Sequence, residues 1–165
     1  MAAAINNNLG NLLTNTYAVP SLLNQSGQDK GTDIIDIATC AIPSSATDLS
    51  GSTYRFCQVG SGDIPITVWF ASTALTAGAI SLGLYNRNTG AVVSVNLFAT
   101  SINCASAVTK ADQRYTNLSI TTAGQRVWQL LGLSSDPNLV YDLVGTSTTA
   151  ATAAGTLLCQ YEASR

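Results

Sequence analysis

Histidine is absent from this sequence, and glutamate occurs once, as Glu162. General acid–base catalysis near neutral pH draws most often on histidine, and then on carboxylates whose pKa the protein has shifted. Serine is abundant, but no Gly-x-Ser-x-Gly motif occurs and no histidine could act as base for a serine nucleophile. The composition therefore argues against an enzyme, and we expect no catalytic residue.

Charged residues are also scarce in this sequence. Asp, Glu, Lys and Arg make up 10% of the chain, whereas soluble domains carry about a quarter. Seven basic and nine acidic residues leave a formal net charge of −2, and the basic residues are scattered. Phosphate binding needs clustered Lys and Arg, so we expect no nucleic-acid partner. Such a weakly charged surface suits a protein that other subunits cover.

Long apolar runs are also missing, because no stretch approaches the 18 residues of a membrane span. The N-terminus lacks the basic start and unbroken apolar run of a secretory signal, so we expect synthesis in a cytoplasm and no membrane partner. Asp29, Asp33 and Asp36 lack the central glycine and closing glutamate of a calcium loop. We therefore expect no metal and no cofactor.

The four cysteines are Cys40, Cys57, Cys104 and Cys159. They lie far apart and include no Cys-x-x-Cys pair, which argues against a zinc site. Cys40, Cys57 and Cys159 each lie in strand-like sequence. We expect reduced, buried thiols that pack as small hydrophobic side chains, with one disulfide among them as the alternative.

What the sequence does contain is apolar residues alternating at period two, most clearly between residues 64 and 98. Such alternation is typical of strands with one buried and one wet face. Three runs show this alternation: residues 64–70, 80–84 and 93–97. A turn of small residues separates the first two, and the polar stretch Asn86 to Gly90 separates the last two. The last two predict a β-hairpin. Trp69 faces opposite to Val68 and Phe70, either in a second core layer or as an interface anchor.

Five further segments predict strands: residues 32–40, 54–59, 115–120, 139–144 and 157–162. Val127, Leu130 and Leu131 follow helical spacing, and Gly132 stands at the expected C-cap, so residues 125–132 predict one helix of about two turns. We expect Trp128 to help fill one end of the sandwich. The pattern predicts an all-β fold, an antiparallel β-sandwich or jelly-roll-like barrel of about eight strands with one short helix and an extended N-terminal arm.

Residues 1–31 differ in composition from the domain, residues 32–165. They are too polar to build a core of their own and too apolar for a solvated tail. We expect an extended arm that orders on a neighbouring subunit; the alternative is a leader packed along its own domain. The arm's predicted partner-binding residues are Leu12, Leu13, Tyr17, Leu22 and Leu23.

Seven tracts carry a further signal: Trp69-Phe70, Leu75 to Gly78, Leu82 to Tyr85, Gly90 to Val93, Leu97 to Ala99, Val127 to Asn138 and Thr148 to Gly155. These tracts resemble small structural proteins of tailed-bacteriophage virions. Together they span roughly residues 64–160 and leave the arm outside. The similarity is to head proteins of the decoration or cement type.

The resemblance implies a virion structural protein that binds the outside of the phage head shell and stabilises contacts between capsomers. Its implied partners are the major capsid protein and further copies of itself, as a homodimer or homotrimer. Its implied place is the exterior of the virion, after synthesis in the host cytoplasm. The alternative from another class is a receptor- or glycan-binding module of a head fibre or tail. An enzyme is the third reading, and a pocket lined by Asp63, Asp112 and Lys110 would favour it.

Overall fold

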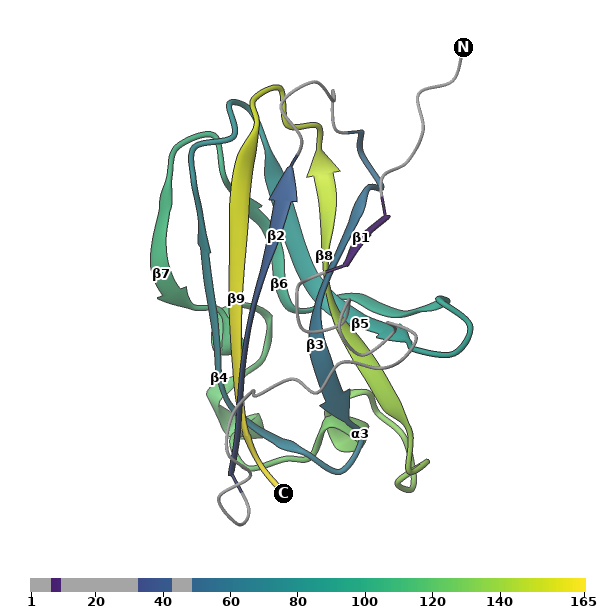
Figure 1. Ribbon diagram of the computed structural model, residues 1–165. Coiled ribbons are helices and arrows are strands. Elements are labelled where there is room, and N and C mark those ends of the chain that lie inside the picture. The colour runs from purple at the N-terminus through teal and green to yellow at the C-terminus, as the bar shows by residue number, and fades with distance from the viewer. Residues whose placement is uncertain (1–6, 10–32, 43–48) are drawn as a thin grey trace.

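Two β-sheets pack face to face in this chain (Figure 1). The computed structural model describes residues 7–9, 33–42 and 49–165. Sheet A has the order β1 (Asn7–Leu9), β3 (Thr53–Gly60), β8 (Val140–Thr149), β5 (Ala79–Asn86) and β6 (Val92–Asn103). Sheet B has the order β2 (Asp33–Ile42), β9 (Gly155–Ser164), β4 (Ile64–Ser72) and β7 (Val108–Asp112). Every paired neighbour is antiparallel except β1, which runs parallel to β3. The predicted antiparallel β-sandwich is confirmed.

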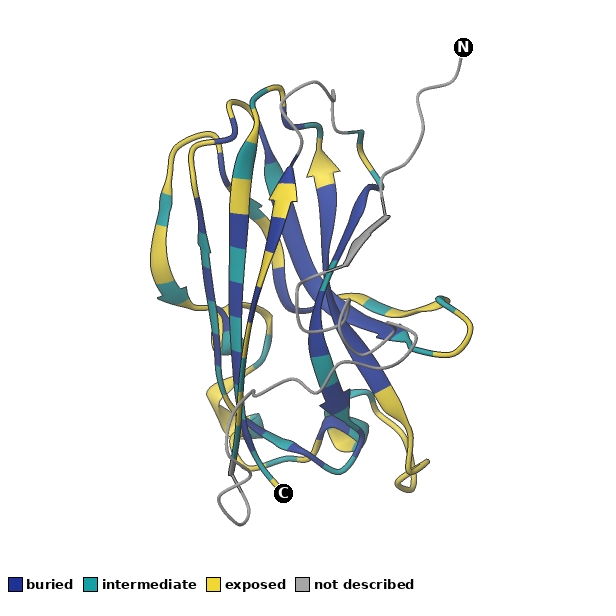
Figure 2. Cartoon of the chain, viewed as in Figure 1, coloured by how far each residue is buried: buried dark blue, intermediate teal, exposed yellow. Residues whose placement is uncertain are grey.

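The core lies between the inward faces of the two sheets, where Figure 2 shows the buried positions. Phe56 of β3 and Phe70 of β4 meet there edge to face, with ring centroids 6.5 Å apart and an interplanar angle of 79°. This arrangement is the one that aromatic quadrupoles favour, and it joins sheet A to sheet B. The predicted period-two strands therefore bury their apolar faces against each other.

The cysteines belong to this core: all four are buried and free, which confirms the first of the two expectations. Burial raises the pKa of the Cys40 thiol to about 12. It also raises the pKa values of Cys57, Cys104 and Cys159. The thiols pack as small hydrophobic groups and are protonated at neutral pH.

The predicted hairpin is confirmed as β5 and β6, and its far end projects from the side of the sandwich (Figure 1). The Asn86 side chain accepts hydrogen bonds from the N–H groups of Asn88 (2.9 Å) and Thr89 (3.0 Å), and Gly90 supplies the positive φ of +70°. Side-chain bonding of this kind stabilises a tight turn. The tip of the hairpin is thus held by its own residues.

The predicted strand at residues 115–120 is wrong. That stretch contains the short helix α2 (Arg114–Asn117) and the start of the 3-10 helix η1 (Ile120–Thr122), and β7 pairs with β4 instead. The Ser119 hydroxyl accepts a hydrogen bond from the N–H of Thr121, and Nδ2 of Asn117 donates to the Asn96 carbonyl. Local side-chain bonds of this type compete with a strand ladder.

The predicted helix is present but shorter, as α3 (Val127–Leu130). Gly132 has the expected positive φ, and the Gln129 side chain accepts a hydrogen bond from the N–H of Arg126 at 2.9 Å. Val127 is the buried residue of α3, and Trp128 is only half-buried. In the part of the chain that the structure describes, no helix is long and apolar enough to cross a membrane.

The close packing of the β5 and β6 backbones at Gly83 gives a first testable prediction. A Cβ built on Gly83 of β5 would lie 2.0 Å from the carbonyl oxygen of Ser94 on β6. We expect Gly83→Ala to lower the free energy of unfolding in urea by about 2–3 kcal/mol, because β6 would have to move away. Gly62→Ala is the control, since a Cβ there meets only side-chain ends at 3.2 Å or more. Equal losses in both variants would contradict the close packing of β6 on β5.

Candidate functional site

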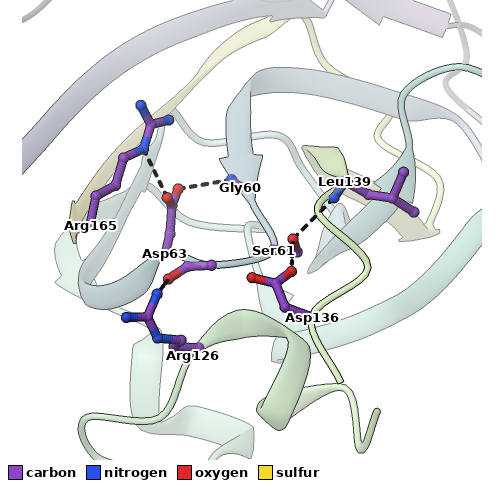
Figure 3. Close-up of polar contacts among 8 residues, drawn as sticks. Gly60, Ser61, Asp63, Arg126, Asp136, Leu139 and Arg165 are labelled. Atoms are coloured by element: carbon purple, nitrogen blue, oxygen red, sulfur yellow. Dashed lines mark hydrogen bonds and ion pairs between the residues drawn. The ribbon is translucent and has the colours of Figure 1, made fainter. Parts of the chain in front are cut away.

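A polar cluster closes one end of the sandwich, at the turn between β3 and β4 (Figure 3). Asp63 is buried and accepts hydrogen bonds from the N–H of Gly60 at 2.8 Å and from Nε of Arg165 at 3.0 Å. Nη1 of Arg126 donates to the carbonyl of Gly62 at 2.8 Å. The turn, the N-terminal side of α3 and the end of β9 are therefore tied together at Asp63.

Ser61 connects this cluster to the segment before β8. Its hydroxyl donates to Oδ1 of Asp136 at 2.5 Å and accepts from the N–H of Leu139 at 3.0 Å. The hydrogen bond from Ser61, and then that from the N–H of Asn138, lower the pKa of Asp136. The carbonyls of Asp63 and Ser61 also accept from the first N–H groups of α3, at 2.9 and 3.0 Å. Since free N–H groups at a helix start need acceptors, the turn caps α3.

The cluster lines an open cavity of about 390 Å³. The carboxylates of Asp63 and Asp136 both accept hydrogen bonds from other groups of this chain. Asp63 lines the cavity, but Lys110 and Asp112 lie on β7, so the structure does not bring the three residues together. Within residues 7–9, 33–42 and 49–165, no three His, Cys, Asp or Glu side chains could hold a metal ion. The geometry of the cluster supports a structural role.

The outer face of sheet B is a second feature. Ile35 and Ile37 of β2 point outward and are 48% and 50% exposed, and exposed and buried positions alternate along β2 in Figure 2. Ile37 stands beside Gln160 of β9, which stands beside Trp69 of β4. Trp69 is half-buried on this face, with Nζ of Lys110 5.1 Å from its ring centroid. It is outside the main core. The choice between a second core layer and an interface anchor for Trp69 stays a prediction.

The far end of the β5–β6 hairpin is a third feature. Val92, Val93 and Val95, named here the hairpin surface, are 58%, 40% and 37% exposed. The sequence pattern grouped Val93 and Val95 with Leu97, yet only Leu97 is buried. The reason is that the register between β5 and β6 shifts near Leu84, and the hairpin end projects beyond the body of the sandwich (Figure 1).

A buried ion pair lies in sheet A near the base of this hairpin. Nη1 of Arg55 on β3 contacts Oδ2 of Asp142 on β8 at 2.6 Å, and the Asp142 side chain is fully buried. Among the described residues, no group donates a hydrogen bond to its other oxygen, Oδ1. Burial raises the pKa of Asp142 more than the hydrogen bond and charge of Arg55 lower it. A buried pair of this kind is costly to desolvate, so its presence is weak evidence for a contribution to stability.

The predicted arm residues Leu12, Leu13, Tyr17, Leu22 and Leu23 all lie outside the residues that the structure describes. Three other residues of the predicted arm, Asn7–Leu9, form β1 on the chain's own sheet A. Those three residues follow the alternative of packing on their own domain. Contact between the arm and a second subunit stays a prediction.

Sequence reasoning missed the end cluster and both apolar surfaces. No local signal in the sequence indicates that Ser61 and Asp136 meet, because they are 75 residues apart in the chain. Ile35 and Ile37 lie in the predicted strand at residues 32–40, but period-two alternation does not say which side of a strand another layer covers. One signal in the sequence was Asp36, which lies between Ile35 and Ile37 in β2 and so points to the opposite side, toward the core.

Comparison with known proteins adds little. No protein-family model matches the chain, and no curated protein sequence matches it. Among solved structures, a chain described as "Cyanophage Pam1 capsid asymmetric unit" superposes with a TM-score of 0.48 at 14% identity. The match covers 90% of this chain and 96% of that chain. Similarity at this level carries no functional argument, so function has to be argued from this chain's own residues.

The inward-facing Asp36 makes stability depend on pH. Burial raises its pKa above 3.8, more than Arg165 lowers it. The folded state then binds the proton more tightly than the unfolded chain, so this contribution is full below pH 3.8 and is lost as pH rises through the folded pKa. We expect urea stability to rise between pH 7 and pH 4, and Asp36→Asn to reduce that rise.

Asp136→Asn is the matched control, because the pKa of Asp136 is lowered. Its contribution is present above pH 3.8 and is lost as pH falls through the lower folded pKa, so the variant should leave the slope between pH 7 and pH 4 unchanged. An unchanged slope in Asp36→Asn would contradict the burial of that carboxylate.

Proposed function

We propose that this protein is a virion structural protein of the decoration or cement type, which binds the outside of a capsid shell and bridges neighbouring capsomers. A bridging protein holds two neighbours at once and so needs two separate contact surfaces on one rigid body. Ile35 and Ile37 supply an apolar surface on sheet B, and the hairpin surface supplies another on sheet A. This pair of surfaces is the observation that carries the proposal.

The exposure of these side chains has an energetic meaning. Full burial of a Val or Ile side chain contributes about 1.5–3 kcal/mol, so burying the part still exposed contributes about 1 kcal/mol each. Apolar groups gathered on the surface of a soluble protein mark interaction sites. A partner that covers Val92, Val93 and Val95 therefore gains binding energy without any charged contact.

The remaining features fit the same role. The two sheets are locked by the buried core and the end cluster, which suits a body that carries load between its neighbours. The few charged residues are partly used within the chain, as in Arg55 with Asp142 and Arg165 with Asp63. The proposed partners are the major capsid protein and further copies of this chain, at the virion exterior, as the sequence resemblance implies.

The receptor- or glycan-binding alternative would be favoured by open aromatic rings on the surface. Lys110 lies over the ring of Trp69, and the guanidinium of Arg114 lies 4.4 Å from the ring centroid of Tyr115. The lining of the end cavity contains no aromatic residue among those described. Stacking on a sugar ring would have to displace these cations.

Binding to the shell tests the proposal. Purified protein is mixed with capsids stripped of it, and co-sedimentation and particle heat stability are measured. We expect saturable binding at a fixed ratio to the shell protein and a raised melting temperature of the particle. Val93→Lys should weaken binding about tenfold or more, because it places a charge in the hairpin surface.

Ile120→Lys is the control, since Ile120 is 77% exposed and belongs to neither surface. It should bind as the unmodified protein does. Absence of binding to shells, with binding to host cells or tails instead, would support the receptor-binding alternative. Equal weakening by both lysine variants would argue against the hairpin surface.

The arm can be tested separately. If it anchors the protein, deletion of residues 1–31 should leave a folded domain, measured by circular dichroism, that no longer co-sediments with shells. The reason is that an arm which orders on the shell offsets its ordering entropy through contacts with the shell, and deletion removes those contacts. Full binding by the truncated protein would contradict the arm hypothesis and leave the two apolar surfaces as the means of attachment.

A further inference from the structure

Strand β2 is a long and regular edge of sheet B. It pairs with β9 at ten consecutive positions, from Asp33 with Ser164 to Ile42 with Gly155, and no register shift interrupts the ladder. Among the strands that the structure describes, β2 has a neighbour in the sheet on one side only. The open side of such a strand is a template for another strand.

The other sheet edges are less suited to pairing. Proteins protect edge strands with charge, proline, bulges or short length. β7 has five residues and carries Lys110, β6 has three register shifts against β5, and β1 has three residues. β2 has neither Lys, Arg nor Pro and no bulge in its ladder with β9, and its protecting feature is the inward-facing Asp36.

We infer that β2 pairs with β2 of a second copy of this chain, antiparallel and centred on Ile37, so that two copies of sheet B join into one sheet. Directly opposite residues in a sheet point to the same side. A two-fold centre at Ile37 therefore matches outward positions with outward positions. Ile37 then faces Ile37 of the partner subunit, and Ile35 faces Thr39 of the partner subunit.

Charge decides between the possible centres. A centre at Asp36 would place two carboxylates directly opposite each other, which destabilises a pair. The centre at Ile37 places Asp36 opposite Ala38 of the partner subunit and Asp33 opposite Ala41 of the partner subunit. The isoleucines of both copies then form one apolar row on the outer face. This self-complementary pattern is what a two-fold contact requires.

The inference deepens the proposed function by naming the surface for self-association and leaving the hairpin surface for the shell. It rests on the proposed function only for that division of roles. Self-association is measured with the purified protein alone and shell binding with shells, so each can fail without the other. The rival occupant of the β2 edge is the chain's own residues 10–32, which would give a monomer.

Sedimentation equilibrium of the full chain tests the pairing. We expect a dimer, and we expect Ile37→Lys to weaken it about a hundredfold, because two ammonium groups would meet at the two-fold axis. Ile35→Lys is a second variant with the same expected direction. Both positions are half-exposed, so circular dichroism should show an unchanged fold. Val92→Lys, at an exposed position on the other sheet, should leave the dimer intact.

A disulfide cross-link tests the register of the proposed β2–β2 pairing. The four native cysteines are buried, so Ile37→Cys adds one accessible thiol. Oxidation should convert this variant to a covalent dimer, since opposite Cβ atoms in an antiparallel pair are within reach of a disulfide. Ile120→Cys should form no covalent dimer under the same oxidation. A monomeric native protein, a dimer that Ile37→Lys leaves intact, or a dimer without the Ile37→Cys cross-link would overturn the inference.

Discussion

The ladder between β2 and β9 is the constraint on which the two faces of sheet B depend. Along β9, Leu157, Cys159 and Tyr161 enter the core, while Leu158, Gln160 and Glu162 point outward. The ladder with β2 extends this division to Ile35 and Ile37. Because side chains alternate at period two, a slip of one residue would move these isoleucines into the core and expose the residues now buried. The register that builds the core therefore also builds the contact surface.

Polar groups serve mainly to fix the ends and edges of this sandwich. Asp63 and Ser61 tie the β3–β4 turn to α3, and Asp63 ties it to Arg165 after β9. Arg55 and Asp142 pair within sheet A, near the base of the hairpin. With these charges paired inside one chain, the surfaces left for partners are apolar and weakly charged. Association would then depend on shape and burial more than on electrostatic steering.

The sequence predicted the sandwich because period-two alternation is a local signal, and the hairpin because its turn residues are local too. It failed at residues 115–120, where hydrogen bonds from Ser119 and Asn117 override the strand propensity of the segment. It could not assign Ile35 or Val93 to the exposed side, since exposure depends on which sheet lies opposite. It also missed the meeting of Ser61 with Asp136, which are 75 residues apart in the chain.

The most direct test of the central claim, that two apolar surfaces of one rigid domain hold two neighbours, is hydrogen exchange of the protein bound to capsid shells compared with the free protein. The account predicts slower exchange around Val92 to Val95 on the shell. It predicts slow exchange around Ile35 to Ile37 already in the free protein, because β2 is paired there with a second copy. It predicts no change at the end cluster around Asp63 and Asp136. Protection confined to the end cluster, with unchanged exchange at the hairpin surface, would contradict the account and place the contact at the 390 Å³ cavity.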